Sequence, residues 1–385
     1  MSGRTLADLR PVFVVGIGLH PYTFPSSTPY VALGVQAVRE ALADGGLAWP
    51  DVEVAFVGTG TIGMAAGRML TRHLGSTGLD IQQVENASAS GSTAFRLACL
   101  QVATGLSDVA LALGVDKASP TIQRAANKDG VPRFSAAADL PVVKFALMAQ
   151  DYMRRTGSTA EQLAAVAVKN HGNAARNPYA QFRKIRTLEQ VLASPKVAGV
   201  LTVMQCCPRG DGAAAVIVAS ADGIGRLGLD RSRAVRVLAS VSESERPAVE
   251  ESAGAIELTR RVAERAYREA GIGPPEVDIC ELHEAFSIEE LAYMEALGLC
   301  PDGEGGRFIA SGRGAIGGGG CAVNPSGGLL GMGHPLGPTG IGQVAEITRQ
   351  LRGEAGDRQH PEARTGFAHM IGLGQVGLAH VLRKD

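Results

Sequence analysis

Short apolar segments with strand character alternate along this chain with longer segments that have helical spacing. In the first part of the sequence, predicted strands at 12–16, 52–57 and 109–114 alternate with predicted helices at 31–44 and 64–74. Such alternation is typical of a largely parallel sheet whose faces are covered by helices. The chain is therefore predicted to have an α/β fold.

The same order of elements recurs later in the chain. Further strands are predicted at 213–219, 234–239, 277–282, 366–370 and 377–382, and helices at 253–270, 287–297 and 340–352. This repetition predicts a duplicated βαβ unit, with an N-terminal half at 1–232 and a C-terminal half at 233–385. Between about 116 and 205 the chain is polar and helical in pieces, and this excursion from the first half is expected to cover a site.

Charge and cysteine content limit the classes of function that this chain can have. Lys and Arg number 37 against 38 Asp and Glu, so there is no basic excess that would favour a nucleic-acid partner. The six cysteines lack CxxC spacing and indicate reduced thiols, with no metal site; Cys206 and Cys207 are expected to pack beneath the helix that follows Ser88. No apolar run approaches the roughly 18 residues that span a bilayer, so we expect a cytoplasmic protein without a membrane span.

The segment 84–95 is suited to hold a nucleophile at Ser88. Its neighbours are small, which leaves room for an acyl group and permits a strained turn. We expect a strand end followed by a helix, where free backbone N–H groups and the helix dipole favour a thiolate or a developing oxyanion. The alternative interpretation is that Ser88 only caps the helix, a position that serine favours.

A second candidate is His334 in the segment 324–337. Gly333 and Pro335 flank it on what we expect to be a rigid loop, which suits a fixed hydrogen-bond donor or base. A lone histidine is more often structural. The surrounding glycines favour a functional role, because they bring the backbone close to whatever the imidazole faces.

Several motifs in a fixed order resemble those of the thiolase superfamily, most of all its sterol carrier protein 2 thiolase and lipid-transfer branch. They are an N-x-C-x-S-G motif with serine at its third position (86–91), a HEAF box (283–286) and an N-x-S-G-G…G-H-P-x-G segment (324–337). Residues 170–181, 211–215 and 368–372 also resemble that branch, so the match covers nearly the whole chain.

The resemblance implies a thiolase fold, in which two similar βαβ-type halves form a five-layer αβαβα sandwich. It also implies a homodimer that acts on a coenzyme A thioester or an acyl-carrier thioester. Coenzyme A is then a substrate, and no covalently bound cofactor and no metal are expected.

The resemblance also implies roles for individual residues. The residue at the position of Ser88 accepts the acyl group, and the histidine matched by His334 activates it. His334 and His283 help form one oxyanion hole, and a second is formed by the N–H groups of Ser88 and of Gly372 or Gly374.

Further residues are expected around this centre. Arg183 and Lys184 meet the phosphates of coenzyme A or, equally, form a solvated charged face. His171 touches the substrate or is a surface or capping group. The supporting residues are Glu284 and Asn324, and the substrate-binding residues are His171, Arg183, Lys184 and Ser326.

The chain departs from the family pattern at each cysteine. Position 88 is serine, position 285 of the HEAF box is alanine, and the closing segment 369–371 has no thiol. A serine hydroxyl needs a general base in contact with it, and a Ser-His pair without an orienting carboxylate is weak.

Three interpretations stay open. The first is an acyl-CoA acyltransferase for Claisen-type carbon–carbon bond formation or cleavage, in which Ser88 replaces a natural cysteine. The second is a retro-aldolase of the lipid-transfer type without a covalent intermediate. The third is a non-catalytic acyl-CoA-binding or scaffold subunit, docked with a zinc-ribbon/OB-fold or second thiolase-like partner.

Overall fold

The computed structural model of this chain describes residues 4–118, 141–246, 254–373 and 376–384. Its main feature is a ten-stranded sheet with the strand order β10-β9-β11-β12-β8-β1-β7-β4-β2-β3. The strands are β1 (Val12–Thr23), β2 (Val54–Gly58), β3 (Asp80–Val84), β4 (Val109–Asp116), β7 (Asp211–Ser220), β8 (Val235–Ser244), β9 (Ile279–Glu281), β10 (Ala322–Val323), β11 (Thr365–Gly372) and β12 (Val376–Arg383). The helices are α1 (Tyr30–Gly45), α2 (Ala66–Thr71), α3 (Ser90–Ala103), α4 (Pro141–Thr156), α5 (Ala160–Ala174), α6 (Leu188–Leu192), α7 (Ala221–Leu227), α8 (Gly254–Ala270), α9 (Ser287–Ala296), α10 (Gly305–Ala310), α11 (Gly328–Met332) and α12 (Leu336–Arg352).

The sheet consists of two halves with the same internal order. The N-terminal half contributes β3-β2-β4-β7-β1 and the C-terminal half β10-β9-β11-β12-β8, so corresponding strands occupy corresponding places. The halves join where residues 12–14 of β1 pair antiparallel with residues 235–237 of β8. The predicted duplication is thus visible in the strand order, although the two halves show no clear residue-level repeat.

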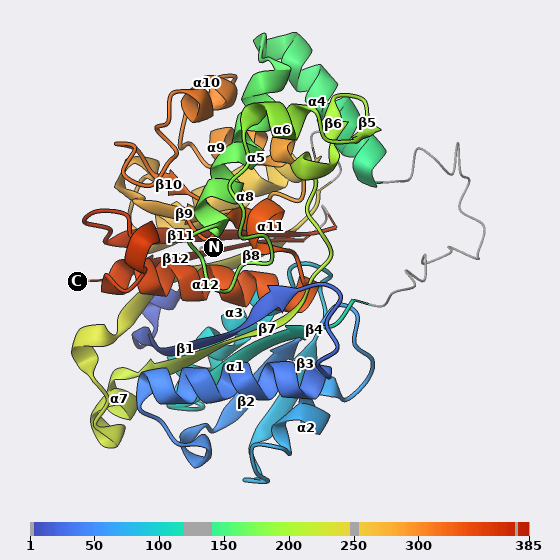
Figure 1. The fold of residues 1–385 in the computed structure, drawn as a ribbon. Coiled ribbons are helices and arrows are strands. Elements are labelled where there is room, and N and C mark those ends of the chain that lie inside the picture. Colours follow the sequence, from blue (N-terminus) through green and yellow to red (C-terminus); the bar gives the residue numbers. More distant parts are fainter. Residues whose placement is uncertain (1–3, 119–140, 247–253, 374–375, 385) are drawn as a thin grey trace.

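Helices form three layers around the two halves of the sheet (Figure 1). Helices α3 and α12 lie between the halves and contact each other, and α12 touches strands of both. Helix α1 covers the outer face of the N-terminal half, and α8 covers the outer face of the C-terminal half. The five-layer αβαβα sandwich is therefore confirmed.

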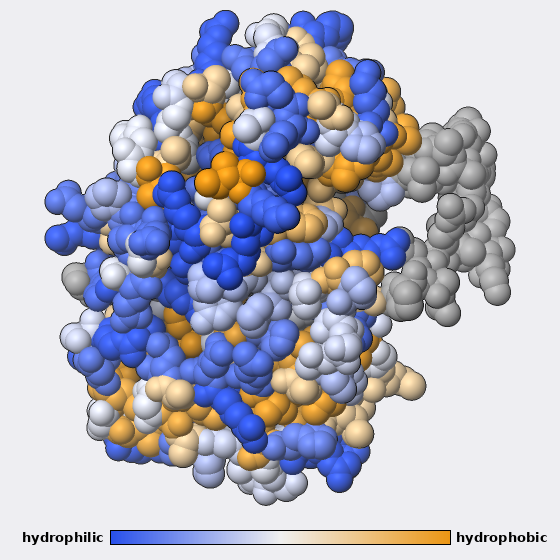
Figure 2. Space-filling model, in the orientation of Figure 1, coloured by the Kyte–Doolittle hydropathy of each residue, from blue (hydrophilic) through white to orange (hydrophobic). Residues whose placement is uncertain are grey.

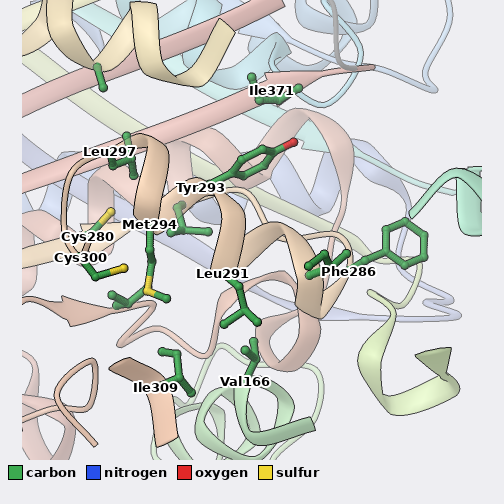
Figure 3. Packing of buried hydrophobic residues seen from close by; sticks show 14 of the residues in the cluster. Val166, Cys280, Phe286, Leu291, Tyr293, Met294, Leu297, Cys300, Ile309 and Ile371 are labelled. Atoms are coloured by element: carbon green, nitrogen blue, oxygen red, sulfur yellow. The ribbon is translucent and has the colours of Figure 1, made fainter. Parts of the chain in front are cut away.

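The central strands β4 and β7 of the N-terminal half are buried along their whole length because helices cover both faces of the sheet there. A second large cluster fills the C-terminal half and joins it to the excursion. Figure 3 shows part of it, where Leu291 and Met294 of α9 lie near Ile309 of α10 and Val166 of α5.

The sheet is mixed, which corrects the prediction of a largely parallel one. Strand β7 pairs antiparallel with β1 and β4, and β12 pairs antiparallel with β8 and β11. The parallel pairs are β2 with β3 and β4, and β9 with β10 and β11. Three residues separate β11 from β12, and the long excursion precedes β7. Neither strand therefore follows a crossover helix of the kind that makes neighbouring strands parallel. Alternation predicts the type of each element but not the direction of these two strands.

The excursion forms a small helical unit on the C-terminal half. It contains α4, α5, α6 and a two-stranded sheet of β5 (Lys196–Ala198) and β6 (Leu201–Thr202), and it lies at the top of Figure 1. Helix α5 contacts α9, α10 and α11. Hydrophilic residues predominate on the face that Figure 2 shows, with hydrophobic ones interspersed. Of the helices that the structure describes, none is long and apolar enough to cross a lipid bilayer.

Candidate active site

The candidate site lies where the N-termini of the two central helices meet. Ser88 precedes the first residue of α3 by two positions, and His334 precedes the first residue of α12 by two positions. Glycines allow this approach. A Cβ at Gly91 would lie 2.1 Å from the carbonyl oxygen of Gly337, and one at Gly340 would lie 2.3 Å from Ser92 Oγ. Close-packed interiors do not admit such overlaps, so the glycines let the two turns come together.

Side-chain hydrogen bonds hold the turn that carries Ser88. Ala87 adopts a left-handed conformation with φ +49°, which costs a residue with a Cβ roughly 1 to 2 kcal/mol. The Ser90 hydroxyl donates to the Ala87 carbonyl at 2.7 Å and accepts from the Asn86 N–H at 2.9 Å. The N-cap residue of α3 is Ala89, so the interpretation of Ser88 as a helix cap is wrong.

Ser88 and His334 are in direct contact. The Ser88 Oγ lies 3.0 Å from His334 Nε2, and both side chains are buried. On the far side of the imidazole, His334 Nδ1 lies 3.0 Å from Thr339 Oγ1. The Thr339 hydroxyl donates its only proton to the carbonyl of Pro335 at 2.6 Å, so it accepts from Nδ1–H. This assigns the ring proton to Nδ1 and leaves the lone pair of Nε2 facing the serine hydroxyl.

Burial keeps this imidazole neutral. The pKa of His334 lies well below its ordinary value, because burial disfavours the imidazolium and His283 is nearby. The two rings stand edge to face with centroids 5.3 Å apart. A neutral, oriented imidazole can accept the proton of Ser88, as a general base must.

Asp116 ties the His334 turn to the N-terminal half. This buried carboxylate at the end of β4 accepts hydrogen bonds from the amides of Gly337 (2.6 Å), Gly60 (2.8 Å) and Thr61 (2.8 Å), and from the Thr61 hydroxyl (2.6 Å). The pKa of Asp116 lies above its ordinary value, because the effect of burial exceeds the opposing effect of these hydrogen bonds. The carboxylate fixes the start of α12 and hence the position of His334.

His283 lies in the site, with its ring beside that of His334. Its side chain is 6% exposed, and neither ring nitrogen has a hydrogen-bond partner among the described residues. The nearest carboxylate oxygen, Glu289 Oε1, lies 3.7 Å from Nδ1. Buried polar atoms are normally paired, so the two nitrogens of His283 leave hydrogen-bonding capacity beside His334 unused.

Glu284 and Asn324 belong to a buried polar network behind His283. Asn170 Nδ2 donates to Glu284 Oε1 at 3.0 Å and to Glu290 Oε2 at 2.9 Å. Asn324 donates to Glu290 Oε2 at 2.8 Å and accepts from the Leu282 N–H at 2.9 Å. Burial raises the pKa of Glu284 well above its ordinary value, and Glu290 adds to this rise. The two residues therefore hold loops in place, and their support of catalysis stays a prediction.

The end of strand β11 places Gly372 against the turn that carries Ser88. A Cβ at Gly372 would lie 2.3 Å from the Asn86 carbonyl oxygen and 3.2 Å from Ala89 Cβ. The backbone of Gly372 is thus beside the residues that precede and follow Ser88, as an oxyanion role requires. Gly374 lies outside the described residues.

The four predicted substrate-binding residues occupy different environments. Ser326 is buried, and its amide and hydroxyl donate to the Glu281 carboxylate at 2.8 and 2.6 Å. His171 is also buried, with Nδ1 unpartnered among the described residues, and burial lowers its pKa to about 4. Arg183 and Lys184 are exposed. The structure gives Ser326 a contact within the protein and places the two cations at the surface, so their contacts with substrate stay predictions.

Cys206 and Cys207 lie elsewhere than expected. They do not pack beneath α3. The N–H of Cys207 donates to the carbonyl of Ala285 at 2.8 Å, and Cys206 forms an antiparallel bridge with Phe286. The pair therefore borders the HEAF box, because the excursion returns to the sheet at that point.

Two residues of the site were missed in the sequence. Thr339 stands five positions after His334, within the first turn of α12, and a hydroxyl so close to a candidate base was a usable signal. No local sequence pattern pointed to Asp116, because the amide of Gly337 that it binds lies 221 residues away in the chain. Among the described residues, no group of three or more His, Cys, Asp or Glu side chains could hold a metal ion.

Comparison with protein families supports the motifs found in the sequence. The family model described as "Thiolase, N-terminal domain" matches residues 22–190, and the model "Thiolase C-terminal domain-like" matches residues 240–382. Sterol carrier protein 2 of Gallus gallus is 40% identical over 389 residues, which cover 95% of this chain and 70% of that protein. Benzoylsuccinyl-CoA thiolase subunit BbsB of Thauera aromatica is 39% identical over 379 residues, which cover 95% of each chain.

Solved structures share the fold over nearly the whole chain. The structure of an "Ltp2-ChsH2(DUF35) aldolase" superposes with a TM-score of 0.82 at 25% identity, covering 97% of this chain and 98% of that chain. Human mitochondrial 3-ketoacyl-CoA thiolase gives a TM-score of 0.73 at 18% identity, covering 98% of this chain and 99% of the other.

Proposed function

Since this chain belongs to the thiolase family, we propose that it makes or breaks a carbon–carbon bond of an acyl-CoA or acyl-carrier thioester, with Ser88 as the acyl acceptor. One observation carries this proposal. Ser88 Oγ lies 3.0 Å from the unprotonated nitrogen of a buried imidazole whose other nitrogen is held by Thr339. A hydroxyl, a base and a group that orients the base stand in line, as activation of a serine requires.

The proposed chemistry uses the neutral state of His334. The Ser88 oxygen attacks the substrate carbonyl, and its proton passes to His334 Nε2. The leaving group then takes that proton as the acyl-serine forms. The N–H groups of Ser88 and Gly372 stabilise the oxyanion on one side, and His283 polarises the second carbonyl. The low pKa of His334 favours release of the proton to the leaving group.

A second candidate is retro-aldol cleavage without an acyl-serine. The likeness to the structure of the "Ltp2-ChsH2(DUF35) aldolase" favours it, and so does the lack of a thiol at Ser88, Ala285 and residues 369–371. In this route His334 takes the proton of the substrate hydroxyl, and His283 stabilises the enolate that leaves. The same imidazole and the same oxyanion donors serve both routes.

The excursion is proposed to cover the substrate. The amides of Gln181 and Phe182 donate to the carbonyls of Met332 and Gly331 at 2.9 and 3.1 Å, which brings this segment beside the His334 turn. Arg183 and Lys184 follow directly and are exposed, a position that suits the phosphates of coenzyme A. Coenzyme A serves here as part of the substrate.

The proposed assembly is a cytoplasmic homodimer, with a further protein as partner. Strand β3 is the last strand of the N-terminal half of the sheet and is largely exposed, so its outer edge can pair with a second copy. The name of the relative BbsB calls it a subunit, and the name of the Ltp2-ChsH2(DUF35) aldolase joins two components. We therefore expect a second thiolase-like chain or a zinc-ribbon/OB-fold protein as the partner.

Intact-mass measurement after incubation with a panel of acyl-CoA and 3-hydroxyacyl-CoA thioesters tests this proposal. The expected result is an acyl adduct on the unchanged protein that is absent from Ser88→Ala and forms faster on Ser88→Cys. Cleavage of a 3-hydroxyacyl-CoA that persists without an adduct in Ser88→Ala would establish the second candidate instead. Binding of coenzyme A with no reaction by either the unchanged protein or Ser88→Cys would mark the chain as a binding or scaffold subunit.

A further inference from the structure

A small cavity lies behind His334, on the side of the imidazole that faces Thr339. Its lining comes from four parts of the chain: Tyr22 of β1, Glu281 at the end of β9, residues between 326 and 333, and the first two turns of α12. The cavity measures about 10 Å³, which is the lower limit for holding one water molecule. Thr339 and Gly333 both line it, so the cavity borders the group that orients the imidazole and the residue that precedes it.

The hydroxyl groups in this lining have lone pairs to offer but no free protons. The hydroxyl of Tyr22 donates to the carbonyl of Pro338 at 3.0 Å, and that of Thr339 donates to the carbonyl of Pro335 at 2.6 Å. A hydroxyl has only one proton, so both groups act as acceptors toward the cavity. A molecule with protons to donate is therefore the kind of occupant that these two hydroxyls favour.

Gln343 gives an independent sign that this cavity has an occupant. The residue lines the cavity and is 4% exposed. Its Nε2 donates to the carbonyl of His369 on β11 at 3.2 Å, which fixes the orientation of the amide. Its Oε1 is then buried without a hydrogen-bond partner among the described residues. Buried polar atoms are normally paired with protein or with ordered water, so a donor inside the cavity would satisfy this oxygen.

Glu281 adds a proton donor to the lining. Its two oxygens accept from Ser326, Oε1 from the amide at 2.8 Å and Oε2 from the hydroxyl at 2.6 Å. The carboxyl group is buried, and burial together with the nearby Glu346 raises its pKa to about 8. At pH 7 the group is therefore mostly protonated, and its O–H can donate to an acceptor in the cavity. Water can accept this hydrogen bond and still donate two of its own.

We propose that this cavity binds one water molecule, which accepts from the Glu281 carboxyl group and donates to Gln343 Oε1 and Thr339 Oγ1. Three hydrogen bonds are typical of a buried water. Gln343 is then a positioning residue, because through the water it holds the hydroxyl that accepts from His334 Nδ1–H at 3.0 Å. A Thr339 hydroxyl that donates once and accepts twice is fixed in orientation, and it fixes the tautomer of His334. This inference rests on the role of His334 as the base in the proposed function.

A crystal structure at a resolution that shows ordered water tests the binding site itself. We expect one water peak in the cavity of the unchanged protein, about 2.5 to 3.0 Å from Gln343 Oε1, Thr339 Oγ1 and a Glu281 oxygen. The peak should be absent from Gln343→Met, which has a similar length but no amide oxygen. Glu281→Gln keeps an oxygen for Ser326 and an N–H donor for the water, so this matched control should retain the peak.

Three crystallographic results would overturn the proposal. The first is a cavity without a water peak in the unchanged protein, and the second is a peak that lies out of reach of Thr339. The third is a reversed pattern in the variants, in which the peak persists in Gln343→Met or disappears from Glu281→Gln.

Turnover and the tautomer of His334 test whether the water positions the base. We expect Gln343→Met to lower turnover about 2- to 10-fold, the effect of losing one hydrogen bond, with KM unchanged. In nitrogen-15 spectra, part of the His334 signal should then show the proton on Nε2, a change that a loss of stability alone would not produce. Gln350→Met is the matched control, because its amide lies outside the cavity lining and donates to Glu346 and to the carbonyl of Arg358. This control should keep the turnover and the tautomer of the unchanged protein.

The outcomes separate this inference from the proposed function. Unaltered turnover and an unaltered tautomer in Gln343→Met would overturn the positioning role and leave the proposed function intact. A water peak and a tautomer that both depend on Gln343, in a protein that turns over no thioester, would support the inference and refute the proposed function. Gln343→Leu should give the same losses as Gln343→Met, and the water peak of the unchanged protein decides the question even if neither variant folds.

Discussion

The two halves of the molecule share a strand order but contribute different groups to the site. In the N-terminal half, the turn before the central helix α3 carries a hydroxyl, Ser88. In the C-terminal half, the turn before the corresponding helix α12 carries an imidazole, His334. Both residues stand two positions before the first helical residue, so the site forms where equivalent turns of the two halves meet.

The difference between these turns shows how a duplicated fold acquires chemistry. The N-terminal turn is held by local hydrogen bonds of Ser90, which offset the cost of the left-handed conformation at Ala87. The C-terminal turn has two partners. Thr339 of α12 binds His334 Nδ1, and Asp116 of the N-terminal half accepts from the Gly337 amide. A nucleophile needs a fixed position, whereas a base also needs a fixed tautomer, and the second requirement accounts for the extra partner of His334.

The largest effect on turnover should follow from replacing His334, the residue that the C-terminal half contributes. His334→Gln keeps a polar side chain but cannot accept the Ser88 proton in the same geometry. We expect the turnover of thioesters to fall roughly 10³-fold, as for the loss of a general base, while the melting temperature stays close to that of the unchanged protein. A protein that retains most of its turnover would show that His334 is not the base.

The contact between the two central helices should be sensitive to a single methyl group. In Gly91→Ala the new Cβ would lie 2.1 Å from the Gly337 carbonyl oxygen, and overpacking of this kind costs roughly 1 to 3 kcal/mol. Gly225 in α7 is the matched control, because a Cβ there meets nothing within 4 Å. Gly225→Ala should stabilise the protein by about 0.5 to 1 kcal/mol. Chemical denaturation measures both, and equal effects of the same sign would contradict close contact between the helices.

Acid should destabilise the C-terminal half before the N-terminal half. The core histidines His369 and His380 lie on β11 and β12, and burial lowers the pKa of each to about 3. The corresponding strands β4 and β7 contain no histidine. Because the unfolded chain binds protons near pH 6.5 and the folded histidines do not, their contribution to stability is complete above pH 6.5. It is lost as pH falls toward 3, at roughly 2 kcal/mol for each histidine by pH 5.

Hydrogen exchange followed as a function of pH measures this difference between the halves. We expect β11 and β12 to lose protection at a higher pH than β4 and β7. His380→Gln keeps an acceptor for the Ser240 hydroxyl, which lies 2.9 Å from His380 Nδ1, and removes one titrating group. The pH dependence of unfolding should become less steep by about one proton in this variant. An unaltered slope would show that His380 is not neutral in the folded protein.

A smaller effect on turnover should follow from removing the group that orients the base. Thr339→Val deletes the acceptor for His334 Nδ1–H, and we expect turnover to fall about 10- to 100-fold, as when a partner that orients a catalytic ligand is lost. Thr348→Val is the matched control, because its hydroxyl donates to the carbonyl four residues earlier, as that of Thr339 does, but touches no histidine. Equal turnover in the two variants would show that Thr339 does not orient His334 for catalysis.

Much of this structure could be predicted from the sequence, and the exceptions have physical reasons. Helices and strands with strong periodicity lie where they were expected, as at α1 and β4, because burial of one face or of both sets the pattern. The predicted directions of β7 and β12 were wrong, because neither strand follows the crossover helix that the alternation of elements implied. The motifs predicted Ser88 and His334, whereas Asp116 acts through contacts between residues far apart in the chain, which leave no local signal.

The position of Cys207 illustrates the same limit. Its apolar segment indicated a reduced core thiol, and it was expected to pack beneath the helix that follows Ser88. Only the fold brings residues 206–210 between the HEAF box and the His334 turn.

The protonation state of His334 tests the activation of Ser88 most directly. Nitrogen-15 and proton correlation spectra of protein labelled at histidine distinguish the two neutral tautomers and the imidazolium, and His334→Gln identifies the signal. We expect a neutral ring at pH 7 with its proton on Nδ1 and with Nε2 accepting from Ser88. A proton on Nε2, or an imidazolium at pH 7, would contradict the activation of Ser88 by His334.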